Sequence, residues 1–307
     1  MTSEEVRFRS GACTLAGTFQ PAADPAAAAL LISGSGKVDR NSDAKLPVRG
    51  VLRIGVTRAV AEALAASHVS TLRYDKRGVG ASEGDALRAG MADRRADARA
   101  ALAWLADRQP GLPLLAIGHS EGAWYAAELA ADGLVSGAVL LAGGARPGAQ
   151  ILSWQVDQIV ARLSPAVRLI LRVLRRDVVA AQRRRLARIT SSASDVVRVQ
   201  GIKMNARWYR DFVAYDPAPV LTRISVPVLA ITGGQDIQVP PADVEEVGRL
   251  VQGPFEGHVA GDLSHLFRPD PASRGLRDYR RSARQPVSPE LLRLVTDWAA
   301  RNWDRSR

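Results

Sequence analysis

Short apolar runs alternate with longer amphipathic stretches along most of the chain. Period-2 patterns and short apolar runs predict strands, and apolar residues spaced three and four apart predict helices. The predicted strands are residues 6–9, 13–19, 27–32, 69–74, 114–117, 135–141, 226–231 and 255–260. The predicted helices are residues 50–66, 91–108, 121–131, 242–251 and 289–303. Strands joined by helical crossovers form a mostly parallel central sheet flanked by helices, so we predict an α/β fold.

One segment, residues 146–215, departs from this alternation. Apolar residues from Val156 to Leu174 follow helical spacing, arginines lie off that stripe, and no strand signal is visible. We predict a helical cap (146–215) inserted into a core made of residues 1–145 and 216–307. We expect the stripe to pack on the core and the arginines to be solvated. Attraction of acidic substrates or of an anionic membrane surface is the alternative.

Composition and charge narrow the class of protein. The 307 residues are 47% hydrophobic and 24% charged, which is typical of a globular protein with a large core. Residues 146–210 hold 14 basic and 3 acidic residues, which accounts for the whole net charge of +11. Charge alone does not indicate nucleic-acid binding. The single cysteine, Cys13, excludes an internal disulfide and a cysteine-based zinc site.

The N-terminus and the apolar runs bear on location. The first ten residues start acidic and show no apolar signal-peptide core. The longest apolar run, 26–32, is far shorter than the roughly 20 residues of a membrane helix. We therefore expect a soluble, cytoplasmic protein with no stable membrane insertion.

Residues 118–122 match the pattern G-x-S-x-G. The pattern is weak evidence alone, but here it lies between an apolar strand and an alanine-rich helix, the setting of a nucleophile elbow. Glycines let strand and helix close around the turn, which lifts the Ser120 hydroxyl above the sheet. The turn also aims the Glu121 N–H at a developing oxyanion, near the positive end of the helix dipole. The alternative is an ordinary glycine-rich turn with a buried serine.

A serine nucleophile needs a base, and the chain has four histidines. His265 lies in a loop just after the strand at 255–260, where it can reach over Ser120, so we predict it as the base. His258, inside that strand, is the reserve candidate. His119 is expected to point away from the serine, and His68 to lie at the surface.

The imidazole needs a carboxylate that fixes its tautomer. Asp236 follows the strand at 226–231 and precedes His265 by one helix and one strand, which gives the order serine, aspartate, histidine. Asp216 and Asp243 are the alternatives. Asp216 is expected to end the cap, and Asp243 to cap a helix.

The loop after the strand at 27–32 reads Ser-Gly-Ser-Gly. Its glycines let the backbone approach a substrate closely, so we assign the Ser35 N–H as the second oxyanion donor beside Glu121. The spacing of a P-loop is absent, which argues against phosphate binding. Gly34, Trp154 and Trp208 are candidate substrate-binding residues, although the tryptophans could equally be core anchors.

Together these segments resemble the α/β-hydrolase fold enzymes, in the cap-bearing branch of serine esterases, monoacylglycerol lipases and serine aminopeptidases. The matching pieces, in family order, are LLISGSG, RYDKRGVGASEGD, IGHSEG, WYRDFVAYDP, PVLAITGGQD and DLSHLF. The loop reads SGSG where relatives often carry His-Gly, but it keeps the glycine and the backbone donor. The resemblance implies that Asp75 and Arg77 are structural.

The resemblance implies acyl transfer to water. We therefore predict a serine hydrolase that cleaves carboxylic esters through an acyl-enzyme on Ser120, with His265 and Asp236 completing a triad. The substrate is expected to be a small acyl compound, acidic or lipid-like, and no metal or organic cofactor is needed. An aminopeptidase, a thioesterase or an acyltransferase with the same triad, and a non-catalytic ligand-binding protein, are the alternatives.

Overall fold

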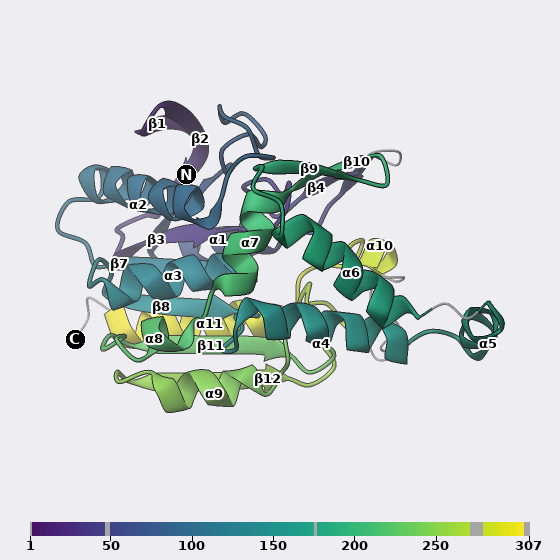
Figure 1. The fold of residues 1–307 in the computed structure, drawn as a ribbon. Coiled ribbons are helices and arrows are strands. Elements are labelled where there is room, and N and C mark those ends of the chain that lie inside the picture. The colour runs from purple at the N-terminus through teal and green to yellow at the C-terminus, as the bar shows by residue number, and fades with distance from the viewer. Residues whose placement is uncertain (1, 47–49, 175–176, 271–278, 304–307) are drawn as a thin grey trace.

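A computed structural model describes residues 2–46, 50–174, 177–270 and 279–303, and an eight-stranded sheet forms its centre (Figure 1). The strand order is β1-β2-β6-β3-β7-β8-β11-β12. All neighbours from β6 to β12 are parallel, and β1 and β2 form an antiparallel edge. This confirms the predicted α/β fold. The bounds are β1 Glu4–Ser10, β2 Cys13–Gln20, β3 Ala27–Ile32, β6 Val69–Tyr74, β7 Leu114–His119, β8 Gly137–Leu141, β11 Val228–Gly233 and β12 Phe255–Ala260.

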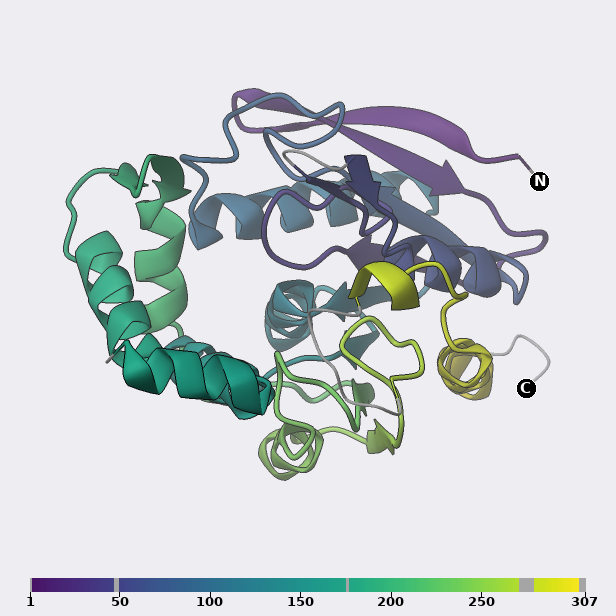
Figure 2. The ribbon, with the colours of Figure 1, turned by 90° about the vertical axis from the view of Figure 1, so that its right-hand side faces the viewer.

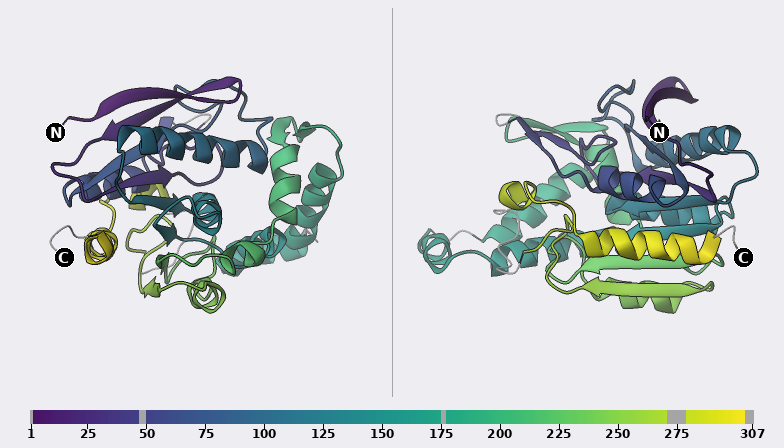
Figure 3. Two further views of the ribbon diagram at one scale, coloured as in Figure 1. Left: turned by 90° about the vertical axis from the view of Figure 1, so that its left-hand side faces the viewer. Right: turned by 180° about the vertical axis from the view of Figure 1, so that it is seen from behind.

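Helices cover both faces of the sheet. Helices α1 (Val56–Ala65) and α11 (Pro289–Trp303) pack on one face, where Figure 3 shows α11 lying along the sheet. On the other face lie α2 (Met91–Arg108), α3 (Glu121–Ala131), α8 (Ala218–Leu221) and α9 (Asp243–Leu250). Strand β3 is buried throughout because alternate residues serve the two cores: Ala29 and Leu31 face α1, and Leu30 and Ile32 face the opposite layer.

Residues 146–215 follow β8 and project from the carboxyl end of the sheet (Figures 1 and 2). They contain α4 (Gly148–Ala161), α5 (Pro165–Val173), α6 (Val178–Thr190), the hairpin of β9 (Val196–Val199) and β10 (Ile202–Asn205), and α7 (Ala206–Ala214). Helix α7 is tied to the core. Asn205 donates to the carbonyls of Ala86 and Ala89, and Asp211 accepts from the Met91 N–H at the start of α2.

Three predictions about these elements were wrong. Residues 50–66 are not one helix, because β5 (Gly50–Leu52) pairs with β4 (Ala44–Leu46). Helix α1 begins only after Gly55, whose φ of 66° is not helical. Residues 146–215 are not helical throughout, because they contain the β9–β10 hairpin, whose turn residues Gln200 and Gly201 both have positive φ. The apolar stripe is split between α4 and α5, and its end is exposed rather than packed. The exposed residues of the stripe at this end are Ile170 and Leu174, and the apolar neighbours Leu169 and Val173 are exposed as well.

Two further short helices, α8 and α10 (Tyr279–Ser282), have no counterpart among the predicted elements. Within the described parts of the chain, no helix is both long and apolar enough to cross a membrane.

Candidate active site

Ser120 stands at a sharp turn between β7, which ends at His119, and α3, which begins at Glu121. Its φ of 58° and ψ of −122° are unusual for a residue with a side chain. Glycine is required on both sides because the backbones nearly touch. A Cβ at Gly118 would collide with the backbone of Gly122, and one at Gly122 would collide with the backbone of Ile32. The motif therefore folds into the strained strand-to-helix turn that its spacing indicates.

His265 and Asp236 meet at the carboxyl ends of neighbouring strands, since Asp236 follows β11 and His265 follows β12. His265 Nδ1 lies 2.7 Å from Asp236 Oδ2, and both side chains are buried. The other carboxylate oxygen, Oδ1, accepts the backbone N–H groups of Gln238 (2.7 Å) and Val239 (3.0 Å). With the Nδ1 proton held by the carboxylate, Nε2 of His265 is left with its lone pair free to accept a proton.

His119 braces the loop that carries His265. Its Nε2 lies 3.0 Å from the His265 carbonyl oxygen, and the two ring centroids are 5.0 Å apart. Burial, together with the neighbouring His265, lowers the pKa of His119 to about 3, so the ring is neutral and its Nε2–H donates to the carbonyl. Sequence reasoning gave this residue no role, because nothing in its spacing indicates a partner so far along the chain.

Ser120 and His265 line the same cavity, which has a volume of about 240 Å³. Gly34, Ser35 and Tyr279 are among the other residues of its wall. Across the described residues, no hydrogen bond joins the Ser120 hydroxyl to His265. Such bonds are often long in unliganded enzymes and tighten with substrate.

The alternative bases and acids have other partners. His258 Nε2 lies 2.8 Å from Glu256. Asp243 is paired with Arg146 at 2.6 Å, and Asp216 accepts a backbone N–H at the start of α8. The structure thus brings Asp236, and neither of its alternatives, into contact with His265.

The loop after β3 lies directly against the nucleophile turn. A Cβ at Gly34 would sit 3.2 Å from the Ser120 Cβ, so the loop backbone approaches the serine closely. Ser35, Ser120 and Glu121 line a second, smaller cavity of about 70 Å³. Glu121 is the first residue of α3, where N–H groups have no partner within the helix. In the described part of the chain no hydrogen bond from the Ser35 N–H is found, so this group is available to an oxyanion, as the assignment of Ser35 requires.

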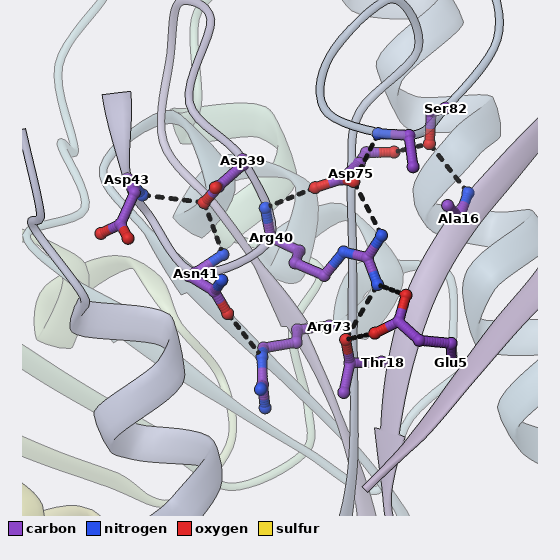
Figure 4. A network of polar contacts seen from close by, with 11 residues as sticks. Glu5, Ala16, Thr18, Asp39, Arg40, Asn41, Asp43, Arg73, Asp75 and Ser82 are labelled. Carbon is purple, nitrogen blue, oxygen red and sulfur yellow. Dashed lines mark hydrogen bonds and ion pairs between the residues drawn. The ribbon is translucent and has the colours of Figure 1, made fainter. Parts of the chain in front are cut away.

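Beyond the glycines, the same loop is fixed by a polar network (Figure 4). Asp75, just after β6, accepts the backbone N–H of Arg40 (2.8 Å), its guanidinium (2.9 Å) and the Ala81 N–H (3.0 Å). Arg40 also pairs with Glu5 at 2.7 Å. Asp75 thus holds the loop at the end of β6, and Arg40 joins it to the edge strand β1 through Glu5, which is compatible with the structural role that the resemblance implies for Asp75.

The Glu121 side chain is the least expected feature of the site. Its carboxylate accepts from Arg94 (2.7 and 2.9 Å), the Tyr125 hydroxyl (2.5 Å) and the Trp208 indole N–H (2.8 Å). Burial acts to raise the pKa of Glu121, but the charges of Arg94 and Lys76 and the hydrogen bonds from these donors outweigh it. The net pKa is therefore lowered and the carboxylate is ionised. Through Trp208 this network ties α7 to the turn that carries Ser120.

Removing one partner of this buried ion pair is expected to be costly. Arg94→Met leaves the Glu121 charge without its main counterion, and we expect a loss of about 3–5 kcal/mol in the free energy of unfolding. Arg99→Met, on the same helix, removes an ion pair to Asp132 in which Arg99 is 43% exposed, and it should cost about 1 kcal/mol or less. Urea unfolding of both variants measures the difference. Equal small losses would contradict the interpretation.

The wall of the smaller cavity is mixed, and residues 146–215 supply much of its apolar and aromatic part. Trp124, Ile151, Leu152, Trp208 and Phe212 line it, so Trp208 stays a candidate substrate-binding residue. Trp154 is not among the residues that line either cavity beside Ser120. Within the described ranges, no group of three or more histidine, cysteine, aspartate or glutamate side chains is placed to hold a metal ion.

Comparison with known proteins places this geometry in context. The sequence profile described as serine aminopeptidase, S33, matches residues 51–265. Esterase EstD of Thermotoga maritima is 25% identical over 256 residues, which are 81% of this chain but only 57% of the esterase. The chain thus spans little more than half the length of that relative.

Two solved structures illustrate the similarity of fold. The ferulic acid complex of Est1E from Butyrivibrio proteoclasticus has a TM-score of 0.63 at 14% identity, over 96% of this chain and 98% of that one. An esterase of Pyrococcus furiosus has a TM-score of 0.61 at 15% identity, over 98% of this chain and 91% of that one. These structures share the α/β-hydrolase fold with the chain.

Proposed function

Because this chain belongs to the serine aminopeptidase S33 family of α/β-hydrolases, we propose that it hydrolyses carboxylic esters through an acyl-enzyme on Ser120. The observation that carries the proposal is the buried hydrogen bond between His265 and Asp236 at a cavity that Ser120 also lines. Ser120, Asp236 and His265 follow the strands β7, β11 and β12, and a nucleophile, an acid and a base at neighbouring strand ends fit a Ser-His-Asp triad.

The proposed reaction has two halves. His265 Nε2 takes the Ser120 proton as the serine oxygen attacks the ester carbonyl, and the N–H groups of Ser35 and Glu121 stabilise the oxyanion. His265 then gives the proton to the leaving alcohol, and the acyl group stays on Ser120. In the second half, His265 takes a proton from water, the hydroxide adds to the acyl carbonyl, and the proton returns to Ser120 as the acid leaves.

Esters are favoured over peptides by the charge of the cavities. An aminopeptidase must hold the ammonium group of its substrate, which calls for a free carboxylate. Of the described residues that line the smaller cavity, Glu121 alone carries a carboxylate, and Arg94, Tyr125 and Trp208 already bind it. The wall of the larger cavity contains no carboxylate among the described residues. The site therefore favours neutral substrates.

The two cavities suggest where each half of an ester binds. The leaving oxygen must lie next to His265, which protonates it, so the cavity of about 240 Å³ that His265 lines is assigned to the alcohol. The acyl chain then enters the cavity of about 70 Å³, which Ser120 also lines. Its small volume favours short acyl chains, and the side chains of Trp124, Ile151 and Phe212 offer them apolar contacts. We further propose that residues 146–215 act as a cap on a core of residues 1–145 and 216–307, since they supply Ile151, Leu152, Trp208 and Phe212 to this wall.

Enlarging the acyl cavity should therefore change chain-length preference. Ile151→Ala removes a buried side chain from its wall, and we expect the ratio of kcat/KM for hexanoate over acetate esters to rise about tenfold. Ile159→Ala serves as the control, because Ile159 lies on the same helix but is 39% exposed. Kinetics with p-nitrophenyl esters of increasing chain length give the comparison. An unchanged ratio in the Ile151 variant would contradict the subsite assignment.

A substrate panel tests the proposed activity itself. We expect Ser120-dependent turnover of p-nitrophenyl acetate and no turnover of amino-acid p-nitroanilides. A higher kcat/KM for thioesters than for matched oxygen esters would favour a thioesterase. Transfer of the acyl group to an added alcohol in preference to water would favour an acyltransferase.

A further inference from the structure

A buried lysine that the proposed reaction does not use lies behind the loop that follows β3. Lys76, just past the end of β6, is 3% exposed, and its Nζ donates a hydrogen bond to the carbonyl oxygen of Gly34. No ion pair between Lys76 and a carboxylate is found among the described residues. Burying a lysine whose hydrogen-bond partner is a backbone carbonyl costs free energy of folding.

The Gly34 carbonyl and the Ser35 N–H belong to one peptide group. The described chain contains no cis peptide bonds, and in a trans peptide the C=O and the N–H point in opposite directions. When Lys76 holds the carbonyl toward the interior, the Ser35 N–H must face the opposite side. Ser35 lines both cavities beside Ser120, so that side is where the oxyanion of the proposed reaction would form.

The positive charge of Lys76 also strengthens the Ser35 N–H as a donor, in addition to orienting the peptide. A hydrogen bond from an ammonium group is stronger than one from a neutral donor, and bonds in series polarise one another. An ammonium on the Gly34 oxygen draws electron density through the peptide and makes the Ser35 N–H a better donor. Burial preserves this effect, because little water is present to screen it.

We propose that Lys76 is a positioning residue that holds and polarises the Gly34–Ser35 peptide, so that the Ser35 N–H is aimed at the oxyanion. This inference rests on the proposed ester hydrolysis at Ser120. It assigns to Lys76 a contribution that appears in the transition state and leaves binding of the ester in the ground state unchanged.

The protonation of Lys76 gives the inference a pH signature. Burial, helped by the positive charge of Arg94 on α2, lowers the pKa of Lys76 to about 7, although Glu121 on α3 and the carboxylates of Asp39 and Asp75 act to raise it. The lysine is therefore charged below about pH 7 and neutral above. Its benefit to kcat should shrink as pH rises through 7, because a neutral amine polarises the peptide less.

Stability should show the opposite trend. Between about pH 7 and the usual lysine pKa of 10.5, the unfolded chain binds a proton at this position that the folded protein does not. The free energy of unfolding contributed by Lys76 therefore rises with pH across that window. A variant without the amine should lose this part of the pH dependence.

The test compares Lys76→Met and Lys76→Gln with wild type, using p-nitrophenyl acetate and a boronic acid that forms a tetrahedral adduct on Ser120. Lys37→Met is the matched control, since Lys37 is an exposed lysine in the same loop region. At pH 6 we expect Lys76→Met to lower kcat about tenfold or more with KM unchanged. Its affinity for the boronic acid should fall by a similar factor. Lys76→Gln keeps a hydrogen-bond donor without the charge, so its kcat should lie between those of wild type and Lys76→Met. The difference from wild type should narrow above pH 7. Lys37→Met should behave as wild type.

The results distinguish failure of the role of Lys76 from failure of the proposed ester hydrolysis. If wild type shows Ser120-dependent turnover and a folded Lys76→Met keeps both kcat and boronic acid affinity, the role of Lys76 is overturned while ester hydrolysis stands. A pH-independent deficit in Lys76→Gln, with boronic acid affinity intact, would also overturn it, as would be seen for a purely structural residue. Should Lys76→Met not fold, Lys76→Gln alone decides. Absence of Ser120-dependent turnover in wild type overturns the proposed function and this inference together.

Discussion

Ser120→Ala should lower kcat for p-nitrophenyl acetate about 10⁴- to 10⁶-fold, the range seen when the nucleophile of a Ser-His-Asp enzyme is removed. The alanine keeps the backbone turn, the N–H groups and both cavities, so only the attacking oxygen is lost. KM should change little, because the hydroxyl contributes to bond formation rather than to binding the ester.

Ser225→Ala is the control for this prediction, since Ser225 is exposed just before β11, away from both cavities. Steady-state kinetics and circular dichroism on the two variants measure activity and folding. A folded Ser120→Ala protein with more than about a tenth of wild-type kcat would mean that another group performs the attack.

Asp236→Asn should lower kcat about 10³- to 10⁴-fold while leaving the fold intact. The backbone N–H groups of Gln238 and Val239 hold the inner oxygen Oδ1, so an asparagine would keep its oxygen there and present its NH₂ group to His265. Nδ1 of His265 would then have to accept, and the ring proton would move to Nε2. The imidazole could no longer take the Ser120 proton.

Asp216→Asn provides a direct comparison, because Asp216 is an acid that the sequence left open, and the structure places it at the start of α8. We expect Asp216→Asn to keep wild-type kcat. Measured rates that are normal in Asp236→Asn and low in Asp216→Asn would reverse the assignment.

Ser120, Asp236 and His265 could be predicted as candidates because each lies next to a recognisable local sequence pattern. The glycines around Ser120 are required by backbone contacts of the turn itself. Asp236 and His265 each follow a short apolar strand, and parallel strands deliver their carboxyl ends to one edge of the sheet. The order of the strands therefore predicted that the residues after them lie at one edge of the sheet.

The surroundings of the site could not be predicted in this way. The contacts of Glu121 with Arg94 and Trp208, of His119 with the His265 carbonyl, and of Lys76 with Gly34 join residues that are distant in sequence. Residue type alone does not say which of many buried polar groups will pair. These contacts depend on how loops and helices pack, which periodicity does not specify.

The errors in the inserted segment have a different cause. The β9–β10 hairpin is short, and its Gln200-Gly201 turn lacks the Asn-Gly or Asp-Gly pair that marks such turns most strongly. Helix α5 continues the apolar spacing of α4 but packs little of it, since Leu169 and Ile170 are more than half exposed. Spacing predicts which residues share a helix face, and it does not say what that face meets.

Labelling with a fluorophosphonate probe, followed by peptide mass spectrometry, tests most directly whether a serine activated by His265 is present. We predict a single adduct on Ser120 in the folded wild-type protein and its near-complete loss in His265→Ala. A folded protein that carries no adduct on Ser120, or that reacts equally well without the His265 imidazole, would contradict the account.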